Sequence, residues 1–270
     1  SLNIPVLAHC EDINMVVGGV VNADKDMAAK GWKGITNAVE DVIVARDILL
    51  AKETGARLHL CHCSTKDSVR MVKAAKLDGV DVSAEVCPHH FTLTSADIPG
   101  NDANYKMNPP LRTKEDVEAL KQGLHDNIMD VIATDHAPHT LEEKERPYAS
   151  APSGGPLVQH SLPMMLELSA QGVLPVETIV EKMCHAPARL FGVRDRGFLR
   201  TGYFADIVLV RPADPWTVSK ENILYKCGWS PLEGTAFSHR IVRTLVNGRT
   251  VYADGRVDTT HRGAELEFDR

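Results

Sequence analysis

The sequence lacks the features that mark membrane proteins and nucleic-acid-binding proteins. None of its apolar runs approaches the roughly 20 residues that a bilayer-spanning helix needs, and no signal peptide is evident at its start. Its 30 Lys and Arg residues are outnumbered by 36 Asp and Glu, which gives a net charge of -6. A chain without a basic excess is a poor partner for nucleic acid or an anionic membrane.

Cysteine is also scarce, and the chain has no internal repeat or low-complexity segment. The 6 cysteines are scattered over 270 residues, too few for a disulfide framework. Cys61 and Cys63 flank His62 as in some zinc fingers, but no matching distal pair follows. We therefore expect a protein of the reducing cytoplasm.

What the sequence does contain is an ordinary globular composition, 43% hydrophobic and 24% charged. Its length suits one large core, and single α/β barrels often have about this length. Strand-like runs lie at residues 4–8, 57–62, 80–86 and 131–134. Helical patterns follow the first, second and third runs, with predicted capping boxes at residues 37–40, 64–67 and 113–116. This β-α alternation predicts parallel pairing, with four strands, half of an eight-stranded barrel.

Beyond residue 139 the pattern changes. Residues 140–156 are polar and rich in Gly, Pro and Ser, as expected of a substrate lid. Two helices are predicted over about 158–171 and 176–185, and the tail then reads as short strands at 205–210, 241–246 and 250–252. Asn247-Gly248 between the last two predicts a hairpin turn.

Three predicted strands end in residues that could bind a metal: His9, His62 and Asp135. The carboxyl ends of parallel barrel strands converge at the barrel mouth, and imidazole and carboxylate groups are zinc ligands. The simpler alternatives are that Asp135 only begins a turn and that each histidine is a hydrogen-bonded structural residue.

Other polar residues near the strand ends are weaker candidates. His89 and His90 end a fourth strand, where neighbouring residues face opposite ways, and we interpret them as supporting or structural residues. Asp126 and Asp130 are expected to be solvated. His139 is a better candidate than His136, which faces away from Asp135 if the strand continues.

Four segments together resemble the signatures of the dihydroorotases, within the amidohydrolase superfamily: residues 9–12 (HCED), 62–66 (HCSTK), 106–112 (KMNPPLR) and 133–139 (ATDHAPH). The resemblance runs from about Ile4 to Val257. The segment around Asn108 discriminates best, because hydantoinases and allantoinases usually lack Asn there.

The resemblance implies a (β/α)8 TIM barrel with two zinc ions per complete active site. The reaction it implies is the reversible cyclisation of N-carbamoyl-L-aspartate to L-dihydroorotate in de novo pyrimidine (UMP) biosynthesis. By match, His9 and His62 would bind the second, more exposed zinc, and Asp135 would bind the first and act as general base and then general acid. Asn108 and His139 would hold the substrate, with backbone from the loop that contains Ser153 and Gly154.

The chain also departs from the family pattern. Residues 154–160 differ from the usual Gly-x-x-Gly-x-Glu, and no His-x-His or bridging lysine or aspartate precedes His9. We therefore expect this chain to be the carboxyl-terminal portion of a dihydroorotase. Alone it would have too few ligands to bind zinc tightly. Residues 1–200 would belong to the barrel and 201–270 to part of a small β-sandwich. The open edges of such a sheet favour pairing in a homodimer.

Two alternatives remain open from the sequence. The chain could be another cyclic amidase, a hydantoinase (dihydropyrimidinase) or an allantoinase, which substrate assays would separate. It could also be a non-catalytic dihydroorotase-like scaffold, since barrels host many functions.

Overall fold

The computed structural model describes residues 4–269, which divide into two compact units. One unit contains residues 5–159 and 225–231, and the other contains residues 160–224 and 232–269 together with residue 4.

The larger unit is built on a parallel sheet with the order β1-β4-β5-β6. Its strands are β1 (Val6–Ala8), β4 (Leu58–Leu60), β5 (Val82–Val86) and β6 (Val131–Ile132). The register pairs Val6 with Leu58 and Leu58 with Val82. All four predicted strands are thus present and parallel, and their carboxyl ends lie at one edge of the sheet.

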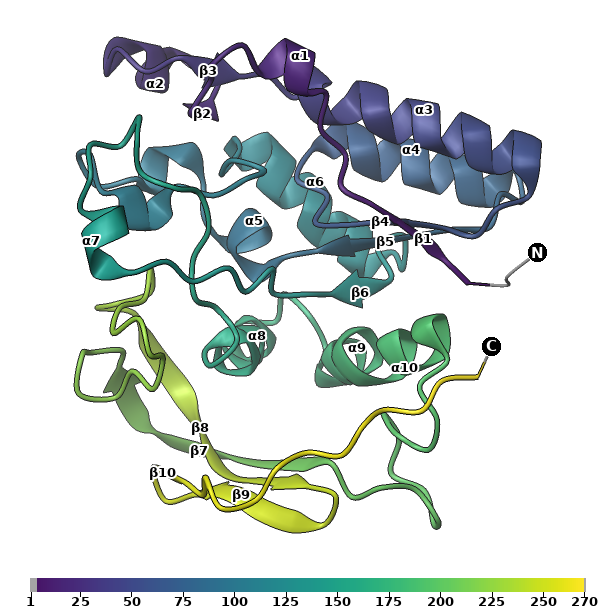
Figure 1. Cartoon of the computed structure of the whole chain (residues 1–270), viewed down its shortest axis with the longest axis vertical. Helices are drawn as coiled ribbons and strands as arrows, with labels where there is room; N and C mark the ends of the chain where they lie inside the picture. The colour runs from purple at the N-terminus through teal and green to yellow at the C-terminus, as the bar shows by residue number, and fades with distance from the viewer. Residues whose placement is uncertain (1–3, 270) are drawn as a thin grey trace. The chain divides into compact units, whose positions relative to one another are not determined.

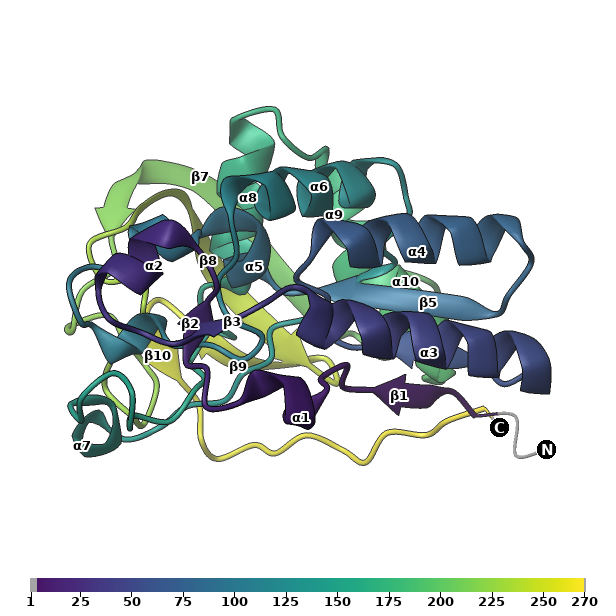
Figure 2. The same cartoon turned by 90° about the horizontal axis from the view of Figure 1, so that it is seen from above.

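Helices connect these strands in the predicted alternation. α3 (Ala38–Thr54) lies between β1 and β4, α4 (Lys66–Leu77) between β4 and β5, and α6 (Lys114–His125) between β5 and β6. α4 packs against both α3 and α6, and the two views show the three helices in a row along the sheet (Figures 1 and 2). Val44, Val72 and Leu120 of these helices are fully buried, as are Leu60 and Ala84 of the strands.

Short elements complete this unit. They are α1 (Ile13–Val16), β2 (Val21–Asn22), α2 (Lys25–Ala29), β3 (Gly34–Ile35), α5 (Pro88–Thr92), the 3-10 turns η1 (Ser95–Asp97) and η2 (Ala103–Tyr105), and α7 (Leu141–Lys144). β2 and β3 pair in parallel as a separate small sheet.

Helix capping follows the sequence in two of the three predicted cases. Thr65 accepts a hydrogen bond from the backbone N–H of Ser68, and Thr113 forms a full capping box with Asp116. The capping box predicted at Asn37 and Glu40 is wrong, because Asn37 makes no side-chain cap. The Glu40 carboxylate instead accepts from Ser64 and its neighbours at the start of α4.

The smaller unit contains helices and an antiparallel sheet. α8 (Ser161–Ala170) is followed by α9 (Val176–Val180), the π turn η3 (Glu181–His185) and α10 (Ala186–Phe191). The sheet has the order β10-β9-β8-β7, with β7 (Ile207–Thr217), β8 (Ala236–Val246), β9 (Arg249–Ala253) and β10 (Arg256–Val257).

The hairpin predicted at Asn247-Gly248 is confirmed. Both residues have positive φ, 52° and 78°, as a two-residue turn between twisted antiparallel strands requires. α8 packs on β8, where Glu167 accepts hydrogen bonds from the backbone and side chain of Ser238. Among residues 4–269, no helix is both long enough and apolar enough to span a membrane.

Candidate active site at the strand ends

The structure brings His9 and His62 into direct contact. His9 directly follows β1, and His62 lies two residues beyond the end of β4, which is the hydrogen-bonded neighbour of β1. Nδ1 of His9 and Nε2 of His62 are 2.9 Å apart, and the ring centroids are separated by 4.8 Å. Two imidazoles that are distant in sequence therefore share one point at the sheet edge.

This pair has the properties of a metal-binding group. Two nitrogens bound tetrahedrally to one zinc at about 2.0–2.1 Å lie roughly 3.3 Å apart. The 2.9 Å hydrogen bond between the two rings would therefore lengthen only slightly to admit the ion. Nδ1 of His62 is buried and has no hydrogen-bond partner among the described residues. Nε2 of His9 lies 3.4 Å from the Glu11 carboxylate, which can orient the ring as carboxylates do for metal-bound histidines. These residues fit a divalent metal such as zinc.

Glu85 on β5 supports His62, a role that the sequence reasoning missed. His62 has a φ of 35°, a left-handed conformation that costs about 1–3 kcal/mol outside glycine. Oε1 of Glu85 accepts from the His62 backbone N–H at 3.2 Å, and its Oε2 lies 3.0 Å from Nε2 of His59. The sequence signal for this role was the single carboxylate, Glu85, in the mostly apolar strand β5.

Asp135 is exposed and lies three residues beyond the end of β6. It too has a left-handed φ, 43°. Its charge acts on the thiols of Cys61 and Cys87. Burial, Glu85 and Asp135, in that order, raise the pKa of Cys61 to about 11, and the same three causes act on Cys87. No hydrogen bond joins Asp135 to His9 or His62 within residues 4–269.

The sequence had predicted that His89 and His90 end a strand. They lie instead in a short helix just beyond the end of β5. Both lie in α5, where Pro88 occupies the first turn, and both rings are buried with centroids 4.1 Å apart. The alternation argument therefore does not apply to them. Burial and the neighbouring His62 lower the pKa of His89 to about 3, and His90 Nε2 lies 2.8 Å from the carbonyl oxygen of Pro109.

Donor atoms gather in two further groups: His59, Cys61 and Glu85, and Cys87, His89 and His90. Within each group these atoms lie within 4.8 Å of one another. The strand ends thus carry several groups that could bind a metal. Asp130, expected to be solvated, instead accepts hydrogen bonds from Lys76 and from the Ala84 backbone.

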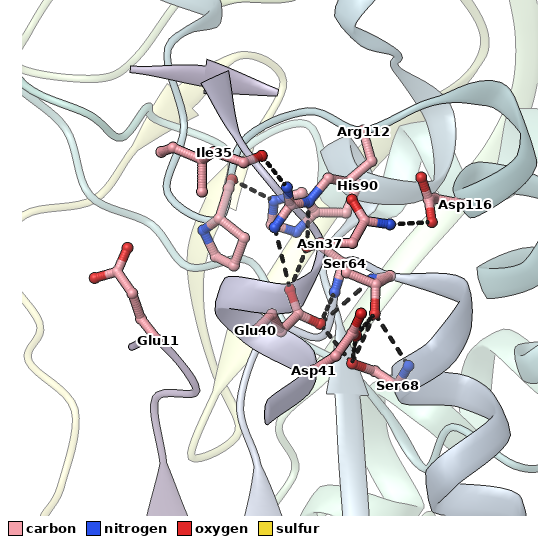
Figure 3. Close-up of polar contacts among 12 residues, drawn as sticks. Glu11, Ile35, Asn37, Glu40, Asp41, Ser64, Ser68, His90, Arg112 and Asp116 are labelled. Atoms are coloured by element: carbon pink, nitrogen blue, oxygen red, sulfur yellow. Dashed lines mark hydrogen bonds and ion pairs between the residues drawn. The ribbon is translucent and has the colours of Figure 1, made fainter. Parts of the chain in front are cut away.

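Asn108 lines the same small cleft as His9. The cleft has a volume of about 10 Å³, room for one water molecule, and Glu11, Glu40 and Arg112 also line it. Figure 3 shows Arg112 surrounded by its partners, with Glu11 standing apart from them. Asn108 and His9 therefore line one opening.

Arg112, from the same segment as Asn108, is a structural residue with 1% exposure. Its guanidinium donates to the Ser64 hydroxyl at 3.1 Å and to the Ile35 carbonyl at 2.9 Å, and it lies 3.8 Å from the Glu40 carboxylate (Figure 3). These contacts fix the segment that carries Asn108 against the starts of α3 and α4.

The structure also joins His139 to the predicted substrate loop. Nε2 of His139 lies 2.9 Å from the carbonyl oxygen of Ser153. Gly154 has a φ of 117°, and a Cβ at this position would lie 2.7 Å from the Ala137 carbonyl, so the loop requires glycine here. His136 accepts a hydrogen bond from Leu157 N–H, so its ring is held by the backbone beyond this loop.

Residues 2–251 match the model of the Amidohydrolase family. The chain belongs to the amidohydrolase family. Its similar curated proteins include the dihydroorotase of Pelobacter propionicus, 43% identical over 93% of this chain and 59% of that protein. The dihydroorotase of Bacillus pumilus is 43% identical over 95% of this chain and 60% of that protein. This amidohydrolase chain thus spans about three fifths of the length of these relatives.

Solved structures of related enzymes have the same fold. The L-hydantoinase (dihydropyrimidinase) of Arthrobacter aurescens has a TM-score of 0.82 at 30% identity, covering 94% of this chain and 58% of that one. The D-hydantoinase of a Thermus species has a TM-score of 0.82 at 26% identity, covering 95% and 58%. The amidohydrolase chain therefore has an α/β fold of the hydantoinase type, a TIM-barrel class.

Proposed function

We propose that this amidohydrolase chain carries the dihydroorotase reaction, the reversible hydrolysis of L-dihydroorotate to N-carbamoyl-L-aspartate in de novo pyrimidine (UMP) biosynthesis. The observation that carries the proposal is the His9–His62 pair, with nitrogens 2.9 Å apart, together with Asn108 in the cleft that His9 lines. The names of the curated relatives support the same reaction.

The proposed cofactor is zinc, with two ions in a complete active site. His9 and His62 would hold the second ion and Asp135 the first. Zinc lowers the pKa of bound water and polarises the carbonyl of the scissile amide. The half-exposed ring of His9 suits the more accessible of the two positions.

The proposed roles of the side chains follow from their chemistry. The Asp135 carboxylate takes a proton from the attacking water and returns it to the leaving amide nitrogen. Asn108 offers both a donor and an acceptor to the edge of the cyclic amide. His139, together with the backbone of Ser153 and Gly154, holds the rest of the substrate.

We further propose the assembly that this function implies. Residues 1–200 would be the carboxyl-terminal portion of the metallo-hydrolase barrel, and residues 201–270 part of a small β-sandwich. The protein would act in the cytoplasm as a homodimer on its small-molecule substrate, without nucleic acid or a membrane.

A second candidate is a hydantoinase or dihydropyrimidinase activity, which the names of the solved structural neighbours favour. A non-catalytic scaffold is the third. The test is to incubate the purified chain with zinc and with L-dihydroorotate, dihydrouracil, hydantoin or allantoin in turn. We expect ring opening of L-dihydroorotate to be far faster than that of the three neutral rings, and to be lost in Asp135→Asn. Turnover of hydantoin or dihydrouracil instead would replace the proposal, and turnover of none would favour the scaffold.

A further inference from the structure

Two buried lysines lie against the loop that carries Ser153 and Gly154. Lys106 follows η2 and is 6% exposed, and Lys144 is the last residue of α7 and 4% exposed. Neither ammonium lies within 4.0 Å of a carboxylate of residues 4–269, and burial lowers the pKa of both lysines, that of Lys144 to about 8. Burying an ammonium without a counter-ion is costly unless all its donors are satisfied.

The donors are satisfied by main-chain carbonyls of the loop. Lys106 Nζ donates to the carbonyls of Tyr148, Ala149 and Ala151, at 2.9, 3.2 and 2.7 Å. Lys144 Nζ donates to the carbonyls of Pro152, Gly154 and Lys106, at 3.0, 3.0 and 3.4 Å. We call Lys106 and Lys144 with these carbonyls the lysine clasp. It spans residues 148–154 almost continuously.

The clasp also links the loop to the other elements of the candidate site. The Gly154 N–H donates to the Lys106 carbonyl at 2.8 Å, two residues before Asn108. Trp229 donates from Nε1 to the His139 carbonyl at 2.7 Å, and its ring lies 5.4 Å from Lys144 Nζ. The Lys106–Asn108 segment, the loop and His139 are therefore held by one set of contacts.

The clasp fixes the direction of the peptide groups in the loop. In a trans peptide the N–H points opposite to the C=O. Because the Pro152 carbonyl points at Lys144, the Ser153 N–H points away from it. This N–H makes no hydrogen bond within residues 4–269. A free, oriented N–H in a loop held by two buried ammonium groups is suited to an anionic group.

We propose that Lys106 and Lys144 are positioning residues that hold the Ser153 N–H for the carboxylate of an acidic cyclic amide, a role that rests on the proposed function. L-dihydroorotate carries such a carboxylate, whereas dihydrouracil and hydantoin do not. The lysine clasp thus selects the acidic substrate through loop geometry and local positive potential, without touching the reacting atoms.

The test compares Lys106→Met, Lys144→Met and Lys144→Gln with Lys73→Met, which alters an exposed lysine of α4. Hydrogen exchange of residues 148–155 is measured in each full chain, with exchange in α3 and α4 as the check on folding. We expect both methionine variants to speed exchange of the loop by about 10-fold or more, with a smaller increase for Lys144→Gln and none for Lys73→Met.

Kinetics then separate positioning from general loss of structure. KM for L-dihydroorotate should rise about 10-fold with kcat changed less than about 3-fold, while any residual kcat/KM for dihydrouracil stays the same. Unchanged exchange in the loop of both methionine variants, or equal losses for acidic and neutral substrates, would overturn the proposal. A wild-type chain that opens no cyclic amide would refute the proposed function and, with it, the role of the clasp in substrate selection. The exchange data would still decide whether the lysines hold the loop.

Discussion

The backbone of His62 shows how one residue at a strand end depends on another strand. Its left-handed φ of 35° turns the chain immediately after β4, and the contact with His9 follows from that turn. Glu85 stabilises this conformation by accepting the His62 N–H, while His59 and Ser83 hold the carboxylate in place through a chain of side-chain contacts. The geometry of His62 therefore rests on Glu85, a residue of the neighbouring strand β5.

Glu85→Gln is expected to weaken metal binding by about 10- to 100-fold, because losing a residue that orients a ligand usually costs this much. Titration with Co²⁺, followed by its visible absorption, measures the affinity without requiring catalysis. Glu118→Gln, which alters an exposed partner of Lys121, is the matched control. Equal affinities for the two variants would show that Glu85 does not position His62.

At the scale of elements, the starts of α3, α4 and α6 are joined by one buried polar network (Figure 3). Glu40 on α3 is 2% exposed and accepts from the backbone and hydroxyl of Ser64 and from the hydroxyl of Ser68. Asp116 on α6 accepts from Asn37 and from the Lys66 N–H. The network replaces the local capping box that the sequence around Asn37 had predicted.

Glu40→Ala is expected to lower the free energy of unfolding by about 3–5 kcal/mol, since it leaves the buried Arg112 charge without its carboxylate. Chemical denaturation at pH 7 measures the change. Glu115→Ala, which removes the exposed partner of Lys66, should cost less than about 1 kcal/mol. A small effect at Glu40, comparable to that at Glu115, would contradict the role given to the network.

Asp41 gives the same network a pH dependence. Burial raises the pKa of Asp41 to about 6 from its ordinary 3.8. Between these values the folded protein binds more protons than the unfolded one, so the contribution of Asp41 to stability is lost as pH rises through about 6. Asp41→Asn removes this loss of stability at higher pH, because the amide does not titrate. The amide oxygen can still accept the hydrogen bond from the Thr65 hydroxyl.

The free energy of unfolding of the variant, minus that of the wild type, should therefore increase by about 1–2 kcal/mol when the pH is raised from 4.5 to 7.5. Urea unfolding of both proteins at the two pH values measures this difference directly. A stability difference that stays constant with pH would show that Asp41 titrates normally in the folded protein.

The features that could be predicted correctly from the sequence are those that depend on residues close together in the sequence. The Thr65 and Thr113 caps and the Asn247-Gly248 turn are local chemistry, and the apolar runs locate the strands. Partners distant in sequence were missed: Glu40 bonds to residues about 25 positions away. His89 and His90 were assigned to a strand because the run before Pro88 hid the start of a helix, which proline favours at its first turn.

At the scale of the whole molecule, the parallel β-α order determines where chemistry can occur. His9, His62 and Asp135 are far apart in the sequence, yet each follows a strand of the same sheet. That placement at one edge of the sheet could be predicted from the sequence because parallel strands have their carboxyl ends on the same side. The lysine clasp could not, because its acceptors are backbone carbonyls, which no residue pattern marks.

The most direct test of this account is the zinc content of the purified chain, compared with those of His9→Ala and His62→Ala. We predict that the wild type, although it binds zinc weakly with these ligands alone, retains more zinc after dialysis against metal-free buffer than either variant. His125→Ala, which alters an exposed histidine of α6, should match the wild type. Zinc retention unaffected by both substitutions, or equally weak in all four proteins, would contradict the assignment of the strand-end histidine pair as a metal site.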